Sequence, residues 1–175
     1  YHRRVSRKEG DSLEYYLYQG QEEMGAISED GVCHQLKILR SLSPNTPIGM
    51  RLEGAIYFPL IDVAGNIAGL VDGEGTLHST YRYTAFGEET PLEEIALFLP
   101  WRFAAKRIDP FTSLVAFGRR DLDPLLGRWI TPDPELFENG PNRYTYAKGN
   151  PFLFFDRFGL LAQTWAAPRY WNFED

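Results

Sequence analysis

The chain between residues 5 and 85 consists of short apolar or alternating stretches separated by clusters of turn-forming residues. Runs of four to eight β-branched and aromatic residues, bounded by Gly, Asn, Asp or Pro, are typical of antiparallel strands joined by hairpin turns. The pattern therefore predicts a mainly β fold built from antiparallel hairpins, with a few short helices. We expect strands at residues 13–18, 22–27, 32–40, 55–61, 67–71 and 76–84.

The most regular part of this pattern is a turn of the form Asp-x-x-Gly. It occurs at Asp62–Gly65 and again ten residues later at Asp72–Gly75. This spacing is about one strand plus one turn, so it predicts hairpins added side by side. The period resembles that of the YD repeat, and a generic β-meander fits it almost equally well. Neither turn has the dense alternating acids of a calcium loop, and turn formation accounts for both aspartates.

Three other segments depart from the hairpin rhythm. Residues 41–47 are polar with two prolines, which predicts a loop. Residues 91–98 place helix formers behind a proline, with acids in the first turn, and predict a short helix. Asn150 and Pro151 are suited to the N-cap and first position of a second short helix, and Gly159 to its C-terminal end. Residues 113–117 are expected to form another strand.

Composition limits the possible functions. A chain of 175 residues is long enough for the core of one domain. Its net charge of −6 argues against nucleic acid or an anionic membrane as a partner recognised by charge alone. Cys33 is the only cysteine, so an internal disulfide is excluded, and we expect it to be a small core hydrophobe. No apolar run reaches the roughly 18 residues of a membrane span, and the first residues do not resemble a signal peptide.

Two aspartates lie in settings unusual for loop carboxylates. Asp133 is flanked by Pro132 and Pro134, which stiffen the backbone on both sides. Asp156 lies near the end of the second expected helix. A rigid loop and a short helix could present the two carboxylates towards one another. The alternative is that Asp133 caps a turn and Asp156 ends a helix.

Other catalytic or metal-binding patterns are weak. The three histidines are far apart and lack ligand spacing, so surface or core roles are expected for them. The sequence has no G-x-S-x-G motif and no persuasive Cys–His arrangement. We therefore predict neither a metal site nor a cofactor. The histidines are His2, His34 and His78.

The stretch from residue 119 to 160 resembles the RHS repeat-associated core domain. This domain is the C-terminal closing module of bacterial RHS (YD-repeat) proteins and of insecticidal toxin-complex C subunits. The first piece follows the family pattern R-Y-Y-D-P-x-x-G-R-F, with Asp121 and Leu122 in place of the two tyrosines, and the last follows D-P-x-G-L. Weaker resemblance extends upstream to about Tyr1. The matching pieces are Arg120–Trp129, Ile130–Pro134, Asn142–Tyr146, Gly149–Pro151 and Asp156–Leu160.

The resemblance implies a module that seals a cargo-enclosing β shell and cleaves its own chain. In the family, the positions of Arg120, Asp133 and Asp156 are implicated in an intramolecular aspartic-type cleavage just after the D-P-x-G-L motif. The bond here would be Leu160–Leu161. In aspartic peptidases, one carboxylate deprotonates water while its protonated partner polarises the carbonyl. Further motif positions are Gly127, Arg128, Pro132, Pro134, Asn150, Pro151 and Gly159.

One departure from the family weakens this expectation. Arg157 stands where the family has proline. The arginine loosens the backbone before the scissile bond and adds a cation beside Asp156, which is expected to lower the pKa of Asp156. A lower pKa makes a shared-proton state harder to reach near neutral pH. Asp121 could also compete with the two site aspartates for Arg120.

The resemblance divides the chain into YD-repeat-like hairpins at 1–87, the core at 88–160 and a tail at 161–175, a remnant of the cargo region. Its partners would be upstream repeats of the same polypeptide and a C-terminal cargo peptide, in an exported or cell-surface bacterial toxin system. Open strand edges could pair two copies into a homo-oligomer. The alternatives are an inactive structural module of the same fold, and a surface module that binds carbohydrate or protein through exposed tyrosines.

Overall fold

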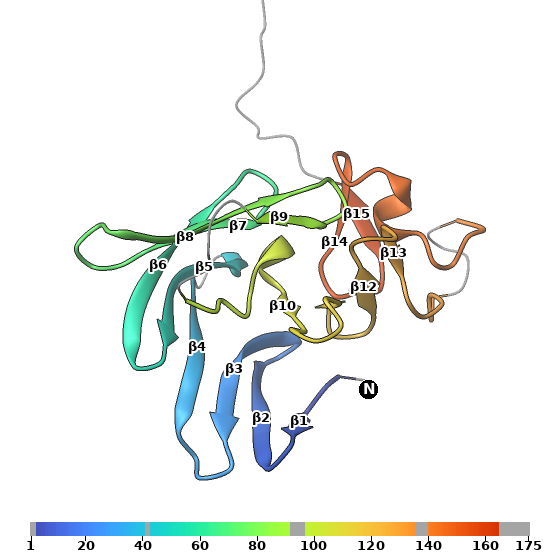
Figure 1. Cartoon of the computed structure of the whole chain (residues 1–175). Helices are drawn as coiled ribbons and strands as arrows, with labels where there is room; N and C mark the ends of the chain where they lie inside the picture. Colours follow the sequence, from blue (N-terminus) through green and yellow to red (C-terminus); the bar gives the residue numbers. More distant parts are fainter. Residues whose placement is uncertain (1–2, 41–42, 92–96, 136–139, 165–175) are drawn as a thin grey trace, which may run out of the picture.

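A computed structural model describes residues 3–40, 43–91, 97–135 and 140–164. The first nine strands form one antiparallel sheet in which each strand pairs with the next in sequence. Figure 1 shows this sheet curving around the segment that follows it. The fold is thus mainly β and antiparallel, as predicted. The strands are β1 (Ser6–Glu9), β2 (Ser12–Gln19), β3 (Glu22–Ser28), β4 (Cys33–Arg40), β5 (Ser43–Leu52), β6 (Ala55–Ile61), β7 (Ile67–Val71), β8 (Leu77–Tyr83) and β9 (Glu89–Pro91).

Two smaller antiparallel sheets follow. Four short strands pair in the order β10–β11–β12–β13, and β14 pairs with β15. The described helical segments are 3₁₀ turns at Phe103–Ala105 and Tyr146–Gly149, and no described helix has the length and hydropathy that a membrane span needs. In Figure 1, β12 to β15 lie together at one side of the curved sheet. The strands are β10 (Arg107–Ile108), β11 (Val115–Ala116), β12 (Asp121–Asp123), β13 (Arg128–Trp129), β14 (Phe154–Asp156) and β15 (Ala162–Thr164).

The Asp-x-x-Gly segments form the predicted turns. The Asp62 carboxylate accepts hydrogen bonds from the backbone N–H groups of Ala64 and Asn66, both at 2.9 Å. Gly65 has a positive φ of 78°, which suits glycine. Asp72 caps the next turn in the same way through the N–H groups two and four residues later. Because this chemistry is local, the sequence predicted the bounds of β6 and β7 correctly.

Two apolar clusters form the interior. The first lies between the nine-stranded sheet and the segment after it, and Trp101 and Leu99 are fully buried there. The second lies under the four short strands β10 to β13, which we call the core strands. There the rings of Phe117 and Tyr146 pack 5.2 and 5.3 Å from that of Trp129. The first contains Met50, Leu52, Ile67, Leu70, Tyr81, Leu99, Trp101 and Ala105. The second contains Phe103, Val115, Phe117, Leu122, Trp129, Tyr146 and Ala147.

Two local predictions were wrong because pairing with the neighbouring strand overrides local propensity. The loop expected at 41–47 is largely strand, since β5 begins at Ser43. The ladder accommodates Pro47 opposite Leu39, between two register shifts, and bulges are where a residue without an N–H group fits a sheet. The helix expected after Asn150 is instead a turn followed by β14, which pairs with β15.

Other expectations are corrected only in detail. Cys33 lies on β4 and is partly exposed, so it is not a core residue. The strand expected at 113–117 is shortened to β11. Pro91 ends β9, and most of the helix expected at 91–98 lies outside the described residues.

Among the glycines of the large sheet, Gly25 leaves the least room for a side chain, and this gives the first prediction. A Cβ atom at this position would lie 2.1 Å from the carbonyl oxygen of Gln35 on the neighbouring strand. Gly25→Ala is therefore expected to push β3 and β4 apart and to lower the free energy of unfolding by about 1–3 kcal/mol. Urea unfolding followed by circular dichroism measures this change.

Gly73 provides the matched control. Its Cβ would meet no atom within 4 Å, and it needs no positive φ. Gly73→Ala should leave stability unchanged or raise it by up to about 1 kcal/mol. Equal effects of the two substitutions would show that β3 and β4 have room for a methyl group.

Candidate functional site

The site is organised around the guanidinium of Arg120. Arg120 is the last residue of a turn that is closed by a hydrogen bond from the N–H of Phe117 to the carbonyl of Arg120. It directly precedes β12. The side chain is buried, and its Cζ lies 4.3 Å from the centre of the Trp129 ring. Its Nε donates a 2.6 Å hydrogen bond to the carbonyl oxygen of Gly159. Burial and stacking leave the guanidinium one orientation, aimed at the Gly159 segment.

Arg120 brings the two predicted aspartates together. Its Nη1 lies 2.8 Å from Oδ2 of Asp133, an ion-pair contact not aligned as a hydrogen bond, and its Nη2 donates to Oδ2 of Asp156 at 3.2 Å. Asp133 is 2% exposed and Asp156 is 4% exposed. The guanidinium thus bridges two buried carboxylates from distant parts of the sequence. Their catalytic role stays a prediction.

Asp156 also accepts hydrogen bonds from the backbone that follows it. Its Oδ1 accepts hydrogen bonds from the N–H groups of Phe158 at 3.1 Å, Gly159 at 2.8 Å and Leu160 at 3.1 Å. These residues lie in the loop that joins β14 to β15, where Asp156 pairs with Ala162. The Leu160–Leu161 bond therefore lies in a short hairpin loop whose first half is fixed by one carboxylate.

Gly159 is needed at this point of the loop. Its φ is +70°, and a Cβ there would lie 3.0 Å from the backbone nitrogen of Arg120. Both the conformation and the space favour glycine. The glycine expected to end a helix therefore allows the loop to approach Arg120 instead.

Asp133 is fixed by its own loop. Its Oδ1 accepts from the N–H of Glu135 at 2.9 Å, and its N–H donates to the carbonyl of Arg143 at 2.9 Å. The Arg143 side chain donates back to the Asp133 carbonyl through Nε at 3.1 Å and Nη2 at 2.6 Å. Pro132 and Pro134 are exposed on either side while Asp133 is buried. Sequence reasoning did not assign Arg143 a role, although it lies within one of the motif pieces.

Burial controls the electrostatics of Asp156. It raises the pKa of this carboxyl above its usual range, and it outweighs the lowering effects of the Leu160 N–H and of Arg120. The expectation that Arg157 lowers this pKa was wrong. The Arg157 guanidinium instead stacks 4.9 Å from the centre of the Phe158 ring.

Asp121 has a different charge partner from the one expected. Its pKa is raised by burial, and the cation that opposes this rise is Arg4. The guanidinium of Arg120 contacts Asp133 and Asp156 instead. The expectation that Asp121 competes with the site aspartates for Arg120 was therefore wrong.

The other motif residues shape the surrounding turns. Gly127 has a φ of +63° and a Cβ there would lie 3.1 Å from the Phe86 ring. The guanidinium of Arg128 lies 4.8 Å from the centre of the Tyr144 ring. The carbonyl of Asn150 accepts hydrogen bonds from the N–H groups of residues 153 and 154, which closes the turn that contains Pro151.

The described histidines lie near the starts of β4 and β8 and form polar contacts there. The ring of His78 lies 2.8 Å from the Asp72 carboxylate, and that of His34 lies 3.0 Å from the Ser28 hydroxyl. His2 lies outside the described residues. Within the described part of the chain, no group of three or more His, Cys, Asp or Glu side chains is placed to hold a metal ion.

Comparison with known proteins identifies the family. The model of the teneurin YD-shell matches residues 3–156. The chain belongs to this YD-shell family. Its relatives include mouse teneurin-3, 32% identical over 105 residues, and human teneurin-4, 31% identical over 110 residues. Each alignment covers 57% of this YD-shell chain and 4% of the relative, so the chain corresponds to a small part of a teneurin.

Solved structures show the same fold in bacterial toxins. The crystal structure of TcdB2-TccC3-Cdc42 matches with a TM-score of 0.62 at 17% identity, over 89% of this YD-shell chain and 8% of that one. The Photorhabdus luminescens Tc holotoxin pore, with an Asp-to-Ala substitution in TccC3, matches with a TM-score of 0.58 at 19% identity, over 95% and 10%. The chain is therefore part of a YD/RHS-type β shell, as the family resemblance predicted.

Proposed function

We propose that this YD-shell chain is an RHS-type core module that closes the end of a cargo-enclosing shell and cleaves itself once, after Leu160. One observation carries the proposal. Arg120 and Asp156 bind the backbone of Gly159 and Leu160 while Arg120 also contacts Asp133. The residues proposed for catalysis thus bind the backbone next to the bond proposed to break. The ordered motif pieces from Arg120 to Leu160 support the finer assignment to the core domain.

In the proposed reaction Asp156 is the acid and Asp133 is the base. The carboxylate of Asp156 accepts a backbone hydrogen bond next to the scissile bond, and burial favours its protonation by raising its pKa. Once protonated, Asp156 donates a hydrogen bond to the Leu160 carbonyl oxygen, and Asp133 takes a proton from water. The water oxygen attacks the carbonyl carbon. The intermediate collapses when Asp133 passes the proton that it took from water to the Leu161 nitrogen. The C–N bond breaks, which leaves a Leu160 carboxyl group and a Leu161 amine. The segment is covalently attached, so the reaction benefits from a high effective concentration.

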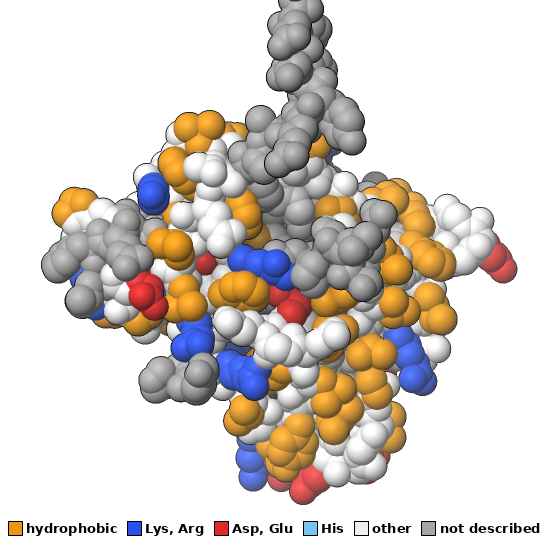
Figure 2. Space-filling model, turned by 180° about the vertical axis from the view of Figure 1, so that it is seen from behind, with side chains coloured by type: hydrophobic (Ala, Val, Ile, Leu, Met, Phe, Trp, Pro, Cys, Tyr) orange, Lys and Arg blue, Asp and Glu red, His pale blue; other side chains and the backbone are white. Residues whose placement is uncertain are grey.

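The proposed organisation assigns 1–87 to YD-repeat hairpins, 88–160 to the core and 161–175 to a short tail that is a remnant of the cargo region. Its partners are further repeats of the same polypeptide and the cargo, in an exported or cell-surface bacterial toxin system. Figure 2 shows hydrophobic side chains gathered in several patches on the face seen from behind. On β6, Ile56, Phe58 and Leu60 alternate as exposed residues. Apolar patches of this kind mark surfaces that pack against further protein, which supports a larger shell.

A structural role for the same residues is the second candidate. The guanidinium of Arg120 neutralises part of the charge of Asp133 and Asp156, and both carboxylates accept backbone hydrogen bonds. This pattern also suits an ion network that only fixes two loops. Whether the Leu160–Leu161 bond is intact in the purified protein decides between the two candidates.

The second prediction is the mass of the purified chain. We expect the wild type to lose the peptide that begins at Leu161, and we expect both Asp133→Asn and Asp156→Asn to retain it. Intact mass spectrometry after incubation at pH 5, 6 and 7 measures the loss. Asp123→Asn, which changes a partly exposed turn carboxylate on β12, is the matched control and should cleave like the wild type.

Arg157→Pro restores the family residue, and we expect it to cleave faster than the wild type. Circular dichroism must show the same fold in every variant. An intact Leu160–Leu161 bond in both the folded wild type and Arg157→Pro would overturn self-cleavage and leave the structural role. Cleavage in Asp133→Asn would overturn the assignment of Asp133 as the base.

A further inference from the structure

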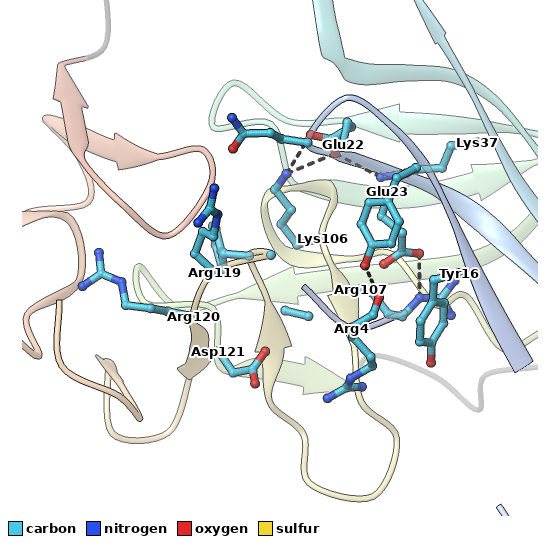
Figure 3. Close-up of a pocket in the computed structure, with 15 residues that line it drawn as sticks. Arg4, Tyr16, Glu22, Glu23, Lys37, Lys106, Arg107, Arg119, Arg120 and Asp121 are labelled. Carbon is cyan, nitrogen blue, oxygen red and sulfur yellow. Dashed lines mark hydrogen bonds and ion pairs between the residues drawn. The ribbon is translucent and has the colours of Figure 1, made fainter. Parts of the chain in front are cut away.

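A small cavity lies between the nine-stranded sheet and the segments around β10 to β12, and Arg120 of the candidate site is among the residues that line it. It has a volume of about 100 Å³ and is lined by residues of β2, β3 and β4 on one side and of the segments around β10 to β12 on the other. Figure 3 shows basic side chains from both sides around it, among them Arg4, Lys106, Arg107 and Arg119. We call it the seam cavity.

Two buried ammonium groups of the seam cavity share one carboxylate. Nζ of Lys37 lies 3.2 Å from Oε1 of Glu22, and Nζ of Lys106 lies 3.0 Å from Oε2 of the same residue. All three side chains are at least nine-tenths buried. The group therefore carries one positive charge more than its carboxylate compensates, in a place where water screens little.

A third cation, Arg107, has Glu23 as its own carboxylate partner, so it leaves the net charge of the group unchanged. Nε of Arg107 donates to Oε1 of Glu23 at 2.7 Å, and its Nη1 donates to the amide oxygen of Gln35 at 2.8 Å. The same Glu23 oxygen accepts from the indole N–H of Trp101 at 3.1 Å. One carboxylate again serves two donors, so Glu22 and Glu23 together carry one charge fewer than Lys37, Lys106 and Arg107. The other acid that lines the cavity, Asp121, has Arg4 as its cation.

Two donors on the wall of the seam cavity have no hydrogen-bond partner. They are Nη2 of Arg107 and the hydroxyl of Tyr16, and both residues are more than nine-tenths buried. The Tyr16 side chain also interacts with Arg4, which can only donate, so the Tyr16 O–H still lacks an acceptor. Leaving a buried donor unpaired is costly, so buried polar groups in native proteins are satisfied by protein atoms, water or a bound ion. The two donors without an acceptor and the two lysines therefore belong to residues that line the same cavity.

We propose that the seam cavity binds an oxyanion, either a tetrahedral dianion or a single carboxylate group. A cavity of about 100 Å³ holds about three water-sized groups, at about 30 Å³ each, which suits one such anion. The oxyanion would accept hydrogen bonds from Nη2 of Arg107 and from the hydroxyl of Tyr16, and it would balance the charge of Lys37 and Lys106. Its effect would be to clamp the large sheet to the core strands.

The protonation of Lys37 supports this assignment. Burial lowers its pKa to about 8, against the raising effects of Glu22 and Glu23, and Lys106 lowers it further. A bound anion would oppose this shift. We therefore expect the oxyanion to bind more tightly at pH 7, where Lys37 carries its charge, than at pH 9.

The third prediction tests the site with sulfate, whose charge is constant over this pH range. The full 175-residue chain is titrated with sodium sulfate up to about 10 mM at fixed ionic strength set with sodium chloride, because high sulfate stabilises any protein non-specifically. Isothermal titration calorimetry and the urea midpoint both follow binding. We expect saturable binding that is at least tenfold weaker in Lys37→Met and in Arg107→Lys. The second substitution keeps the charge and removes the Nη2 donor.

Lys8→Met is the matched control, since it removes an exposed lysine of β1, and it should bind sulfate like the wild type. A parallel titration with acetate separates the two anion classes. Tighter binding of sulfate identifies a tetrahedral dianion, and tighter binding of acetate identifies a carboxylate. Stability that depends only on ionic strength, or equal sulfate binding by the wild type and Lys37→Met, would overturn the proposal.

Discussion

Replacing Arg120 by methionine is expected to lower the free energy of unfolding by about 3–5 kcal/mol, because it leaves two buried carboxylates without their cation. Asp133 and Asp156 are each at least 96% buried, and both contact this one guanidinium. The substitution also removes the Nε hydrogen bond to the Gly159 carbonyl. Urea unfolding of the wild type and the variant at pH 7 measures the difference.

The same experiment can be made specific to charge. If uncompensated carboxylates cause the loss, adding Asp133→Asn and Asp156→Asn to Arg120→Met should recover part of it, since neutral amides need no cation. Arg128→Met is the matched control. It removes an exposed arginine from the same motif and should change stability by no more than about 1 kcal/mol. A triple variant less stable than Arg120→Met would show that the Gly159 contact and the stacking on Trp129 dominate instead.

The hairpin fold was predictable because its turns are local. The carboxylates of Asp62 and Asp72 cap their own turns, so the sequence alone fixes where β6 ends and where β7 begins and ends. The strand at Ser43 and the β14–β15 hairpin were missed because their own residues resemble loop and helix-start patterns. They form because the neighbouring strand pairs with them, at Leu39 opposite Pro47 and at Asp156 opposite Ala162.

The candidate site shows the same limit. Pattern and spacing singled out Asp133 and Asp156, but only the family resemblance connected them to Arg120. The contacts that gather the three residues come from a turn before β12 and a hairpin loop after β14. The seam cavity had no signal in the sequence. Lys37 lies within the apolar stretch Leu36-Lys-Ile-Leu39, and only the fold places it against Glu22 and Lys106.

The largest loss from a single apolar residue is expected at Trp101. This side chain is fully buried, and its backbone bridges to Arg107 outside the regular strands. Its indole N–H reaches Glu23 on β3, and its ring lies 5.3 Å from Nζ of Lys37 on β4. Trp101→Ala should lower the free energy of unfolding by about 3–5 kcal/mol through the cavity it creates. Urea unfolding followed by circular dichroism measures the change.

Two further substitutions separate the contributions of Trp101. Trp101→Phe keeps most of the apolar volume and loses the indole N–H, so about 1–2 kcal/mol is expected for the bond to Glu23. Phe98→Ala removes a nearby aromatic ring that is 45% exposed and should cost less than about 1 kcal/mol. Because Trp101 contacts both the sheet and the segment after it, the wild type should unfold in one transition, and Trp101→Ala should separate it into two. A loss no larger than that of Phe98→Ala would show that the buried charges, rather than this ring, join the sheet to the core.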